Sequence, residues 1–265
     1  MEDIKNLSKT LYEKGKEGLD SRLLIAFNEI DSGGRVLEVG LGRGELTASI
    51  GKLKTDVELY GVDVAEKALE RLRNYLTDFQ LADISCEKLK FEDNYFDTVI
   101  CLEVFEHLQN PYHALVELQR VLVPGGKLII SVPNYLGGHL MIYPGLITSK
   151  FFARFLRQNF FKINRFIPWG PVFNKDNVGR LMDSKCKNKF IGRFLLRGCQ
   201  VTIRFLQMVT KVFGFKVASL YWCHFFICEN RKNDTDSEFW IKQLNQASDF
   251  GQDLGWYDPS FHKKA

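Results

Sequence analysis

One acidic residue, Glu38, stands just before three closely spaced glycines, Gly40, Gly42 and Gly44. The apolar residues around Glu38 favour a buried strand, and the glycines permit a tight turn and a close approach of the backbone to a ligand. Their spacing is GxGxG, which differs from the GxGxxG pattern of dinucleotide sites. Because a carboxylate beside the turn repels a pyrophosphate, the pattern favours a ligand that carries a cationic amino or sulfonium group.

A second acid, Asp63, ends the next apolar segment, residues 57–63. It follows the glycines by about 20 residues, the distance at which a carboxylate on the neighbouring parallel strand reaches the two hydroxyls of a ribose. Asp63 also precedes a helical pattern at 65–75, so helix capping is the alternative role. The spacing favours ribose binding.

Five segments occur in the order and spacing of a known domain, namely LEVGLGRGEL, YGVDV, LADI, FDTVICLEVFEHL and RVLVPGGKLIISVPN. Over about residues 30–135 the chain resembles the class I S-adenosylmethionine-dependent methyltransferases, of the small-molecule, quinone-ring or type 11 kind. The resemblance implies S-adenosyl-L-methionine as cofactor and S-adenosyl-L-homocysteine as product. It assigns Asp83 to the adenine amino group and Ile84 to stacking on the ring. The cofactor contacts that we expect are Glu38, Gly40, Gly42, Gly44, Asp63, Val64, Asp83, Ile84 and Glu103.

Glu106 and His107 follow the fourth expected strand, where the resemblance places the methyl group of the cofactor. Methyl transfer is an in-line displacement, and it needs a base only if the acceptor must lose a proton. Histidine has a free pKa close to neutrality, so His107 and Glu106 are the candidate catalytic residues. Bracing of the following helix is the alternative role. Glu103, Glu106 and His107 also resemble the cluster with which quinone-ring O-methyltransferases bind a divalent ion, but we assign no metal ligand.

Apolar strands alternate with helical patterns, which predicts an α/β, doubly wound, Rossmann-like fold with a seven-stranded, mostly parallel sheet. The ligand site of such a sheet lies at the carboxyl ends of its strands. Strands are expected at residues 36–39, 57–63, 79–84, 96–103, 127–132, 215–221 and 223–229, the last two antiparallel. One or two helices are expected at 4–30 and single helices at 46–53, 65–75, 111–122 and 198–213, with a turn at 124–126.

The expected organisation has five parts. They are an N-terminal helical cap (1–30), the cofactor-binding methyltransferase core (31–135), an inserted acceptor-site lid (136–198), the last helix and strands 6 and 7 of the core (199–232), and a polar C-terminal tail (233–265). The cap either covers the cofactor or simply packs on the sheet. Candidate acceptor contacts at the start of the lid are Tyr135, His139 and Tyr143.

The lid is aromatic and basic, and we expect it to be helical. Segment 151–161 has the spacing of an amphipathic helix, and 167–173 reads as a loop. The apolar face of the helix either packs in the core or lies on a membrane surface or partner. That face contains Phe152, Phe155, Leu156, Phe160 and Ile163.

Composition and charge set further bounds. The chain has 265 residues, 45% of them hydrophobic, which suits one α/β domain with an elaboration. Six cysteines without a CxxC pair favour reduced thiols and a cytoplasmic protein. We expect neither export nor a membrane span, but peripheral membrane contact through 150–165. Residues 136–216 hold fifteen Lys or Arg against two Asp, a net +13 in a chain of +4.

The acceptor that fits these features best is a small lipophilic or membrane-associated molecule that is methylated at oxygen or carbon. A sugar or other soluble metabolite is one alternative. RNA is another, because phosphate contacts and base stacking would use the basic and aromatic residues. The non-enzymatic alternative is a sensor or partner subunit that binds S-adenosylmethionine without transferring the methyl group.

Overall fold

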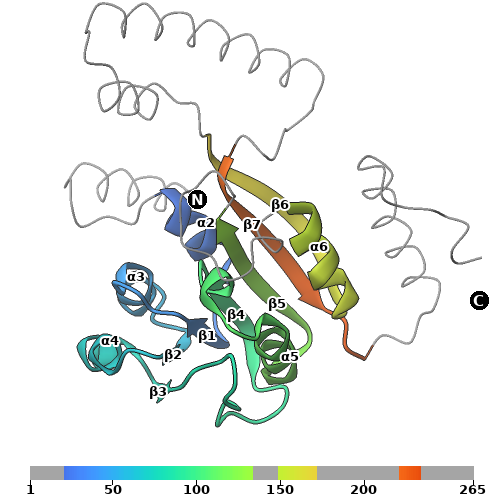
Figure 1. Cartoon of the computed structure of the whole chain (residues 1–265). Coiled ribbons are helices and arrows are strands. Elements are labelled where there is room, and N and C mark those ends of the chain that lie inside the picture. Colours follow the sequence, from blue (N-terminus) through green and yellow to red (C-terminus); the bar gives the residue numbers. More distant parts are fainter. Residues whose placement is uncertain (1–20, 134–148, 172–220, 234–265) are drawn as a thin grey trace, which may run out of the picture.

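The computed structural model describes residues 21–133, 149–171 and 221–233. Within these ranges seven strands form one sheet in the order β3-β2-β1-β4-β5-β7-β6 (Figure 1). The strands are β1 (Arg35–Val39), β2 (Glu58–Asp63), β3 (Asp78–Leu81), β4 (Phe96–Leu102), β5 (Leu122–Pro133), β6 (Phe161–Pro171) and β7 (Tyr221–Asn230). The helices are α2 (Ser21–Glu29), α3 (Glu45–Leu53), α4 (Glu66–Leu72), α5 (Pro111–Val121) and α6 (Ser149–Gln158), with 3-10 turns η1 (Arg73–Tyr75) and η2 (Phe105–His107).

The first five strands are all parallel to one another, as the alternating strand and helix patterns predict. β7 is antiparallel both to β5 and to β6, so β6 runs in the same direction as the first five strands. The predicted doubly wound, mostly parallel, Rossmann-like sheet is confirmed. β7, which contains the expected strand 223–229, is antiparallel as expected.

β6 occupies residues that the sequence assigned to a helical lid and a loop, and this prediction was wrong. α6 ends at Gln158, and Phe160 has φ +60°, which turns the chain out of the helix and into the strand. β6 is the edge strand of the sheet, and an edge tolerates Pro168, which cannot donate a ladder hydrogen bond. β7 contains the strand predicted at 223–229. The expected strand at 215–221 lies outside the described residues except for Tyr221.

The predicted turn at 124–126 is a bulge within β5. The pairing of β5 with β4 passes from Phe96 opposite Leu122 to Thr98 opposite Lys127, so extra residues of β5 loop out between the two pairs. Gly125 supplies the positive φ, +79°, that this excursion needs.

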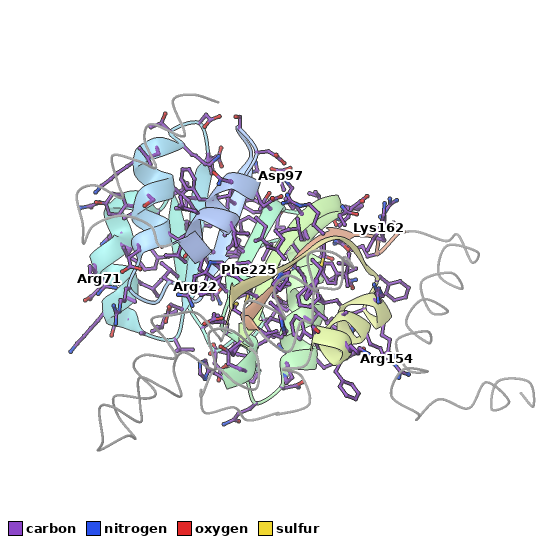
Figure 2. The ribbon with its side chains drawn as sticks, turned by 90° about the horizontal axis from the view of Figure 1, so that it is seen from above. Arg22, Arg71, Asp97, Arg154, Lys162 and Phe225 are labelled. Atoms are coloured by element: carbon purple, nitrogen blue, oxygen red, sulfur yellow. The ribbon has the colours of Figure 1, made fainter. Side chains whose placement is uncertain are left out.

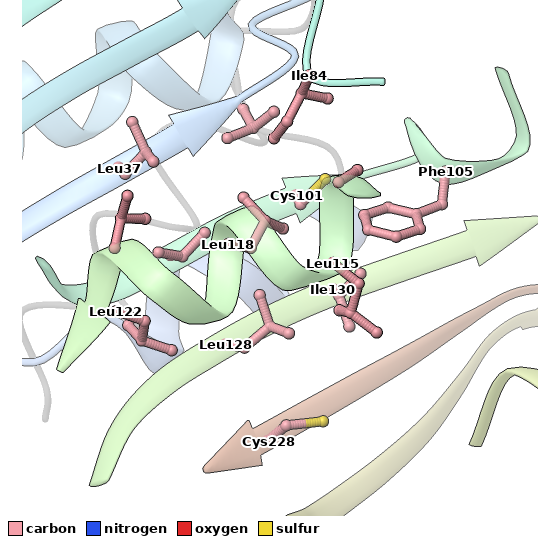
Figure 3. Close-up of a cluster of buried hydrophobic side chains, with 14 of the residues drawn as sticks. Leu37, Ile84, Cys101, Phe105, Leu115, Leu118, Leu122, Leu128, Ile130 and Cys228 are labelled. Carbon is pink, nitrogen blue, oxygen red and sulfur yellow. The ribbon is translucent and has the colours of Figure 1, made fainter. Parts of the chain in front are cut away.

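Two layers of apolar side chains cover the two faces of the sheet. On one face, Leu115 and Leu118 of α5 pack toward Leu128 and Ile130 of β5 (Figure 3). α6 joins this layer, while α2 and α3 form the layer on the other face. Each fully buried side chain of this kind stabilises the fold by about 1.5–3 kcal/mol. The cap helix α2 therefore packs on the sheet.

The amphipathic pattern of α6 belongs to the core. Phe152 and Leu156 are fully buried, which agrees with the core alternative for this stripe. Phe160 and Ile163 lie beyond the end of the helix, so the predicted apolar face was too long. Among the cations of this segment, Arg154 is exposed, whereas Lys162 pairs with Glu229 at 3.6 Å and Arg165 pairs with Glu29.

The last residue of β7 and a residue just after this strand hydrogen-bond to the end of α5. Lys232 Nζ donates to the backbone carbonyls of Gln119, Arg120 and Leu122 at 2.7, 2.8 and 2.6 Å. Asn230 Nδ2 donates to the carbonyl of Leu122 at 2.9 Å. The last carbonyls of a helix have no partner within the helix, so an amide and a cation at this point satisfy them.

The rest of the expected organisation falls on residues that the structure does not describe. These are the first part of the cap (1–20), the acceptor candidates Tyr135, His139 and Tyr143, the helix at 198–213 and the tail beyond 233.

Candidate active site

The carboxyl ends of β1, β2 and β4 lie side by side at one edge of the sheet. In the strand register, Val39 is opposite Val62 of β2 and opposite Cys101 of β4. Asp63 directly follows Val62, and Glu103 comes two residues after Cys101. The strand order therefore places Asp63 on one side of the turn after β1 and Glu103 on the other.

The turn between β1 and α3 requires glycine at Gly40 and leaves open space at Gly42. Gly40 has φ +78°, and a Cβ atom there would lie 2.4 Å from Val104 Cγ2. Gly42 has φ +52°, and a Cβ atom there would meet nothing within 4 Å. Gly44 immediately precedes α3 and packs on Leu72. The two ends of the turn, Gly40 and Gly44, thus pack against other residues of the protein, and the middle of the turn, at Gly42, is left open. Such an arrangement allows a ligand to approach the backbone closely.

Asp63 connects β2 to this turn. Its Oδ2 accepts a hydrogen bond from the backbone amide of Leu41 at 2.7 Å, and its Oδ1 accepts one from the amide of Ala65 at 2.8 Å. The Ala65 contact is a local turn before α4, whose N-cap residue is Ala65 and which has no side-chain capping hydrogen bond, and the Leu41 contact fixes the glycine turn. A carboxylate has about four acceptor sites, so the two amides leave capacity for a diol. Arg71 of α4 adds a hydrogen bond of 3.0 Å to the carbonyl of Gly42, a contact that no sequence pattern indicated.

Glu38 lies beneath the turn and is almost fully buried, with 5% of its surface exposed. Thr47 Oγ1 of α3 donates to Glu38 Oε2 at 2.7 Å. Burial raises the pKa of Glu38 to about 8, the Thr47 hydrogen bond opposes that rise, and the negative charge of Asp63 adds to it. Glu38 is therefore a neutral carboxylic acid at neutral pH, whereas the sequence suggested an ionised carboxylate.

Asp83 lies two residues after β3, in a turn. Asp83 Oδ1 accepts from the amide of Ser85 at 2.8 Å, and the Asp83 amide donates to Glu87 Oε1 at 2.7 Å. Ile84 is 3% exposed and belongs to the core, whereas Val64, after β2, is 67% exposed. Val64 is thus the more accessible of the two apolar side chains that we named for the cofactor.

Glu103 joins the end of β4 to α2. It has φ +55°, its amide donates to the Ser131 carbonyl at 3.0 Å, and its Oε2 accepts from Arg22 at 2.7 Å. Cys223 of β7 lies near Glu103, and burial raises the pKa of its thiol. These neighbours come from 81 and 120 positions away in the chain, so local spacing could not indicate them. Figure 2 shows Arg22 between Arg71, toward one end of the sheet, and Arg154, toward the other.

Glu106 and His107 lie on η2, directly after the end of β4. The Glu106 side chain is 1% exposed and the His107 side chain is 56% exposed, and Glu106 Oε1 lies 3.7 Å from His107 Nε2. Burial raises the pKa of Glu106 to about 8, and the nearby charge of Glu103 adds to the rise. Within the described ranges no group of three or more His, Cys, Asp or Glu has the arrangement of a metal site.

Comparison with known proteins supports the same domain. Residues 37–130 match the methyltransferase domain family. An uncharacterized methyltransferase of Schizosaccharomyces pombe is 37% identical over 123 residues, 42% of this chain and 43% of the relative. The ubiquinone/menaquinone biosynthesis C-methyltransferase UbiE of Burkholderia mallei is 33% identical over 130 residues, 47% of this chain and 54% of the relative. The chain thus spans about half the length of the curated relatives that it matches.

Solved structures share the fold at low sequence identity. Coclaurine N-methyltransferase, bound to N-methylheliamine and S-adenosylhomocysteine, matches with a TM-score of 0.51 at 17% identity, over 80% of this chain and 74% of that one. The [4+2]-cyclase SpnF matches with a TM-score of 0.53 at 18% identity, over 79% and 80%. The match to the methyltransferase domain family, together with the parallel sheet and its glycine turn, identifies a Rossmann-like methyltransferase domain. Residues 37–130 are a domain of the class I S-adenosylmethionine-dependent methyltransferases, whose cofactor is S-adenosyl-L-methionine.

Proposed function

We propose that this protein transfers the methyl group of S-adenosyl-L-methionine to a small lipophilic or membrane-associated acceptor, at oxygen or carbon. The observation that carries the proposal is the open glycine turn at Gly42, with Asp63 on one side and Glu103 on the other. When bound, the cofactor supplies an electrophilic methyl group on a sulfonium. The protein mainly holds the two reactants in line, because positioning supplies most of the rate of such a displacement.

The residues around the turn fit the two ends of the cofactor. Asp63 would accept hydrogen bonds from the ribose hydroxyls, and Asp83 from the adenine amino group, with the exposed Val64 beside the ring and the buried Ile84 packed behind it. Within the described residues, Glu103 Oε1 is buried without a hydrogen-bond partner, so it has a free acceptor site for the cationic amino group. The backbone of Gly40, Gly42 and Gly44 would approach the methionine part of the cofactor closely.

The lipophilic acceptor is supported by the names of several relatives and by the surface of residues 149–171. The UbiE relatives are named for ubiquinone and menaquinone biosynthesis. Phe151 and Phe160 are more than a third exposed in a segment without acidic residues, which suits contact with a lipid surface through 150–165. In the described residues no helix is long and apolar enough to cross a membrane.

RNA is the less favoured acceptor. Lys162 and Arg165 already pair with carboxylates, which reduces the charge that this segment offers to phosphates. A sugar or soluble metabolite would leave the exposed aromatic side chains without a role. A sensor or partner subunit is the non-enzymatic alternative, and the SpnF match shows why the fold alone does not decide, since that protein is described as a cyclase.

The test is transfer of radioactive methyl from labelled S-adenosylmethionine to three acceptors offered in parallel. These are a prenylated phenol in detergent micelles, a nucleotide sugar and total RNA, and the label is counted in organic, aqueous and acid-precipitable fractions. We expect label in the organic fraction, and none with protein unfolded by heat. Label in either other fraction would establish an alternative acceptor. Cofactor binding without label in any fraction would favour the sensor or partner subunit.

A further inference from the structure

The turn that carries Asp83 is held from outside by the segment that leads into α5. His113 Nδ1 lies 3.0 Å from the backbone carbonyl of Ile84, the residue after Asp83. A carbonyl oxygen only accepts hydrogen bonds, so Nδ1 carries a proton and donates. The Oγ atom of the next residue, Ser85, accepts a hydrogen bond from the Gln109 amide at 3.3 Å. The start of α5 and the residues before it thus hold the turn at two consecutive positions.

His113 is itself firmly placed. It belongs to the first turn of α5, where the capping residue Asn110 accepts a hydrogen bond from the His113 amide at 3.1 Å. Pro111 begins the helix, and its ring fixes the backbone there. The next residues, Ala114 and Leu115, are fully buried in the core. The half-buried imidazole therefore extends from a rigid part of the protein.

The hydrogen bonds within the turn shape it but do not fix how it faces the site. Asp83 Oδ1 accepts from the Ser85 amide at 2.8 Å, and the Asp83 amide donates to the exposed Glu87 at 2.7 Å, so both partners belong to the turn itself. The Ile84 side chain, 3% exposed, anchors the turn in the core. Apolar burial has no direction, whereas a hydrogen bond does. The bond from His113 therefore fixes the orientation of the backbone next to Asp83.

We propose that His113 is a positioning residue that makes the site selective for adenine. This inference rests on the proposed assignment of Asp83 to the adenine amino group. By holding the Ile84 carbonyl, His113 fixes the direction in which the Asp83 carboxylate points, so that it meets the amino group of the base. A purine without that group leaves the carboxylate unpaired and is rejected. A turn that can rotate loses this distinction, because the carboxylate then turns to water.

Calorimetric titration with two ligands tests this role. They are S-adenosylhomocysteine and its deamino analogue, whose purine carries hydrogen in place of the amino group. The ratio of the two affinities measures recognition of the amino group, and a general weakening of the site cancels from it. His113→Leu removes the donor, with His113→Ala as its replacement if the Leu variant does not fold. His113→Asn keeps an N–H donor at the same number of bonds from the main chain as Nδ1. Tyr112→Leu, a change at an exposed residue of the same helix turn, is the matched control.

We expect the wild type and Tyr112→Leu to prefer S-adenosylhomocysteine over the deamino analogue by about 10–100-fold. His113→Leu should bring this ratio to about three or below, mainly by weakening the binding of S-adenosylhomocysteine, and His113→Asn should restore most of it. A wild-type ratio in His113→Leu, even with lower affinity for both ligands, would show a merely structural role and overturn the inference. An Asn variant that behaves like the Leu variant would overturn it too.

The wild type separates this inference from the assignments on which it rests. A wild type that binds neither ligand would contradict the cofactor site, and one that binds both equally would contradict the assignment of Asp83. Either result would overturn the role of His113 as well. A wild type that discriminates, with an equally discriminating His113→Leu variant, would overturn the inference alone and leave the proposed function standing.

Discussion

Glu38→Gln tests whether the acid beneath the glycine turn is neutral in the folded protein. Burial raises the pKa of Glu38 from 4.5 to about 8. Between about pH 5 and pH 8 the folded protein therefore binds one proton more at Glu38 than the unfolded chain does. The free energy of unfolding must fall as pH rises through this window, by about 1.4 kcal/mol for each pH unit.

Glu106 adds a second contribution of the same sign, because burial raises its pKa to about 8 as well. The two groups together give a fall of about 2.7 kcal/mol for each pH unit. Glutamine at position 38 can still accept the hydrogen bond from Thr47 but binds no proton, so the variant should lose about half of this slope. At pH 7 it should be more stable than the wild type by about 3 kcal/mol.

Urea unfolding followed by circular dichroism at about pH 5.5, 6.5 and 7.5 measures these slopes. Glu45→Gln is the matched control, because Glu45 is an exposed acid on the first turn of α3, the helix that also carries Thr47. We expect the control to keep the wild-type slope. A Glu38→Gln protein with the full wild-type slope would refute the reasoning, since it would mean that Glu38 is ionised in the folded state.

Four further substitutions test the fold. Gly40→Ala should lower the free energy of unfolding by about 2–5 kcal/mol, because the φ of this residue is positive and its new Cβ atom would clash with Val104. Gly42→Ala should lower it by only about 1–2 kcal/mol, because only the positive φ opposes the new side chain. Equal shifts of the melting temperature in the two variants would contradict this difference. Lys232→Met should lower the free energy of unfolding by about 2–3 kcal/mol, because the carbonyls that Lys232 contacts lose their partner. The affinity for S-adenosylmethionine, measured by calorimetry, should not change. A variant with altered affinity and unaltered stability would contradict this structural role. Phe152→Ala should lower the free energy of unfolding, measured with urea, by about 3–5 kcal/mol. A change near zero would mean that the apolar face of α6 is not part of the core.

The cofactor half of the site was predictable because its signals are local. A strand, a glycine turn and an acid about 20 residues later depend on short-range geometry, and the structure joins Asp63 to the turn through the Leu41 amide. The ionisation of Glu38 was not predictable, because it depends on how completely α3 and the turn cover the side chain. The same holds for Arg22, which reaches Glu103 only after α2 has packed on the sheet.

The segment after β5 was predicted poorly because it satisfies two patterns at once. Phe160 and Ile163 continue the helical spacing of Phe152 and Leu156, and Pro168 suggests a loop. The positive φ of Phe160 and the pairing with β7 override both signals. Pairing across about 60 residues leaves no mark in a local window, so the edge strand β6 could be found only in the structure.

Calorimetric titration with S-adenosylmethionine tests the central claim most directly, on the wild type, on Asp63→Ala and on Asp78→Ala. Asp78 is an exposed acid at the opposite end of its strand from the site, so its variant controls for the loss of one charge. We expect saturable binding by the wild type and the control, and binding weaker by about 10–100-fold in Asp63→Ala, the loss of charge-assisted hydrogen bonds worth about 1.5–3 kcal/mol. Absence of wild-type binding at about 1 mM ligand, or equal affinity in all three proteins, would contradict the account.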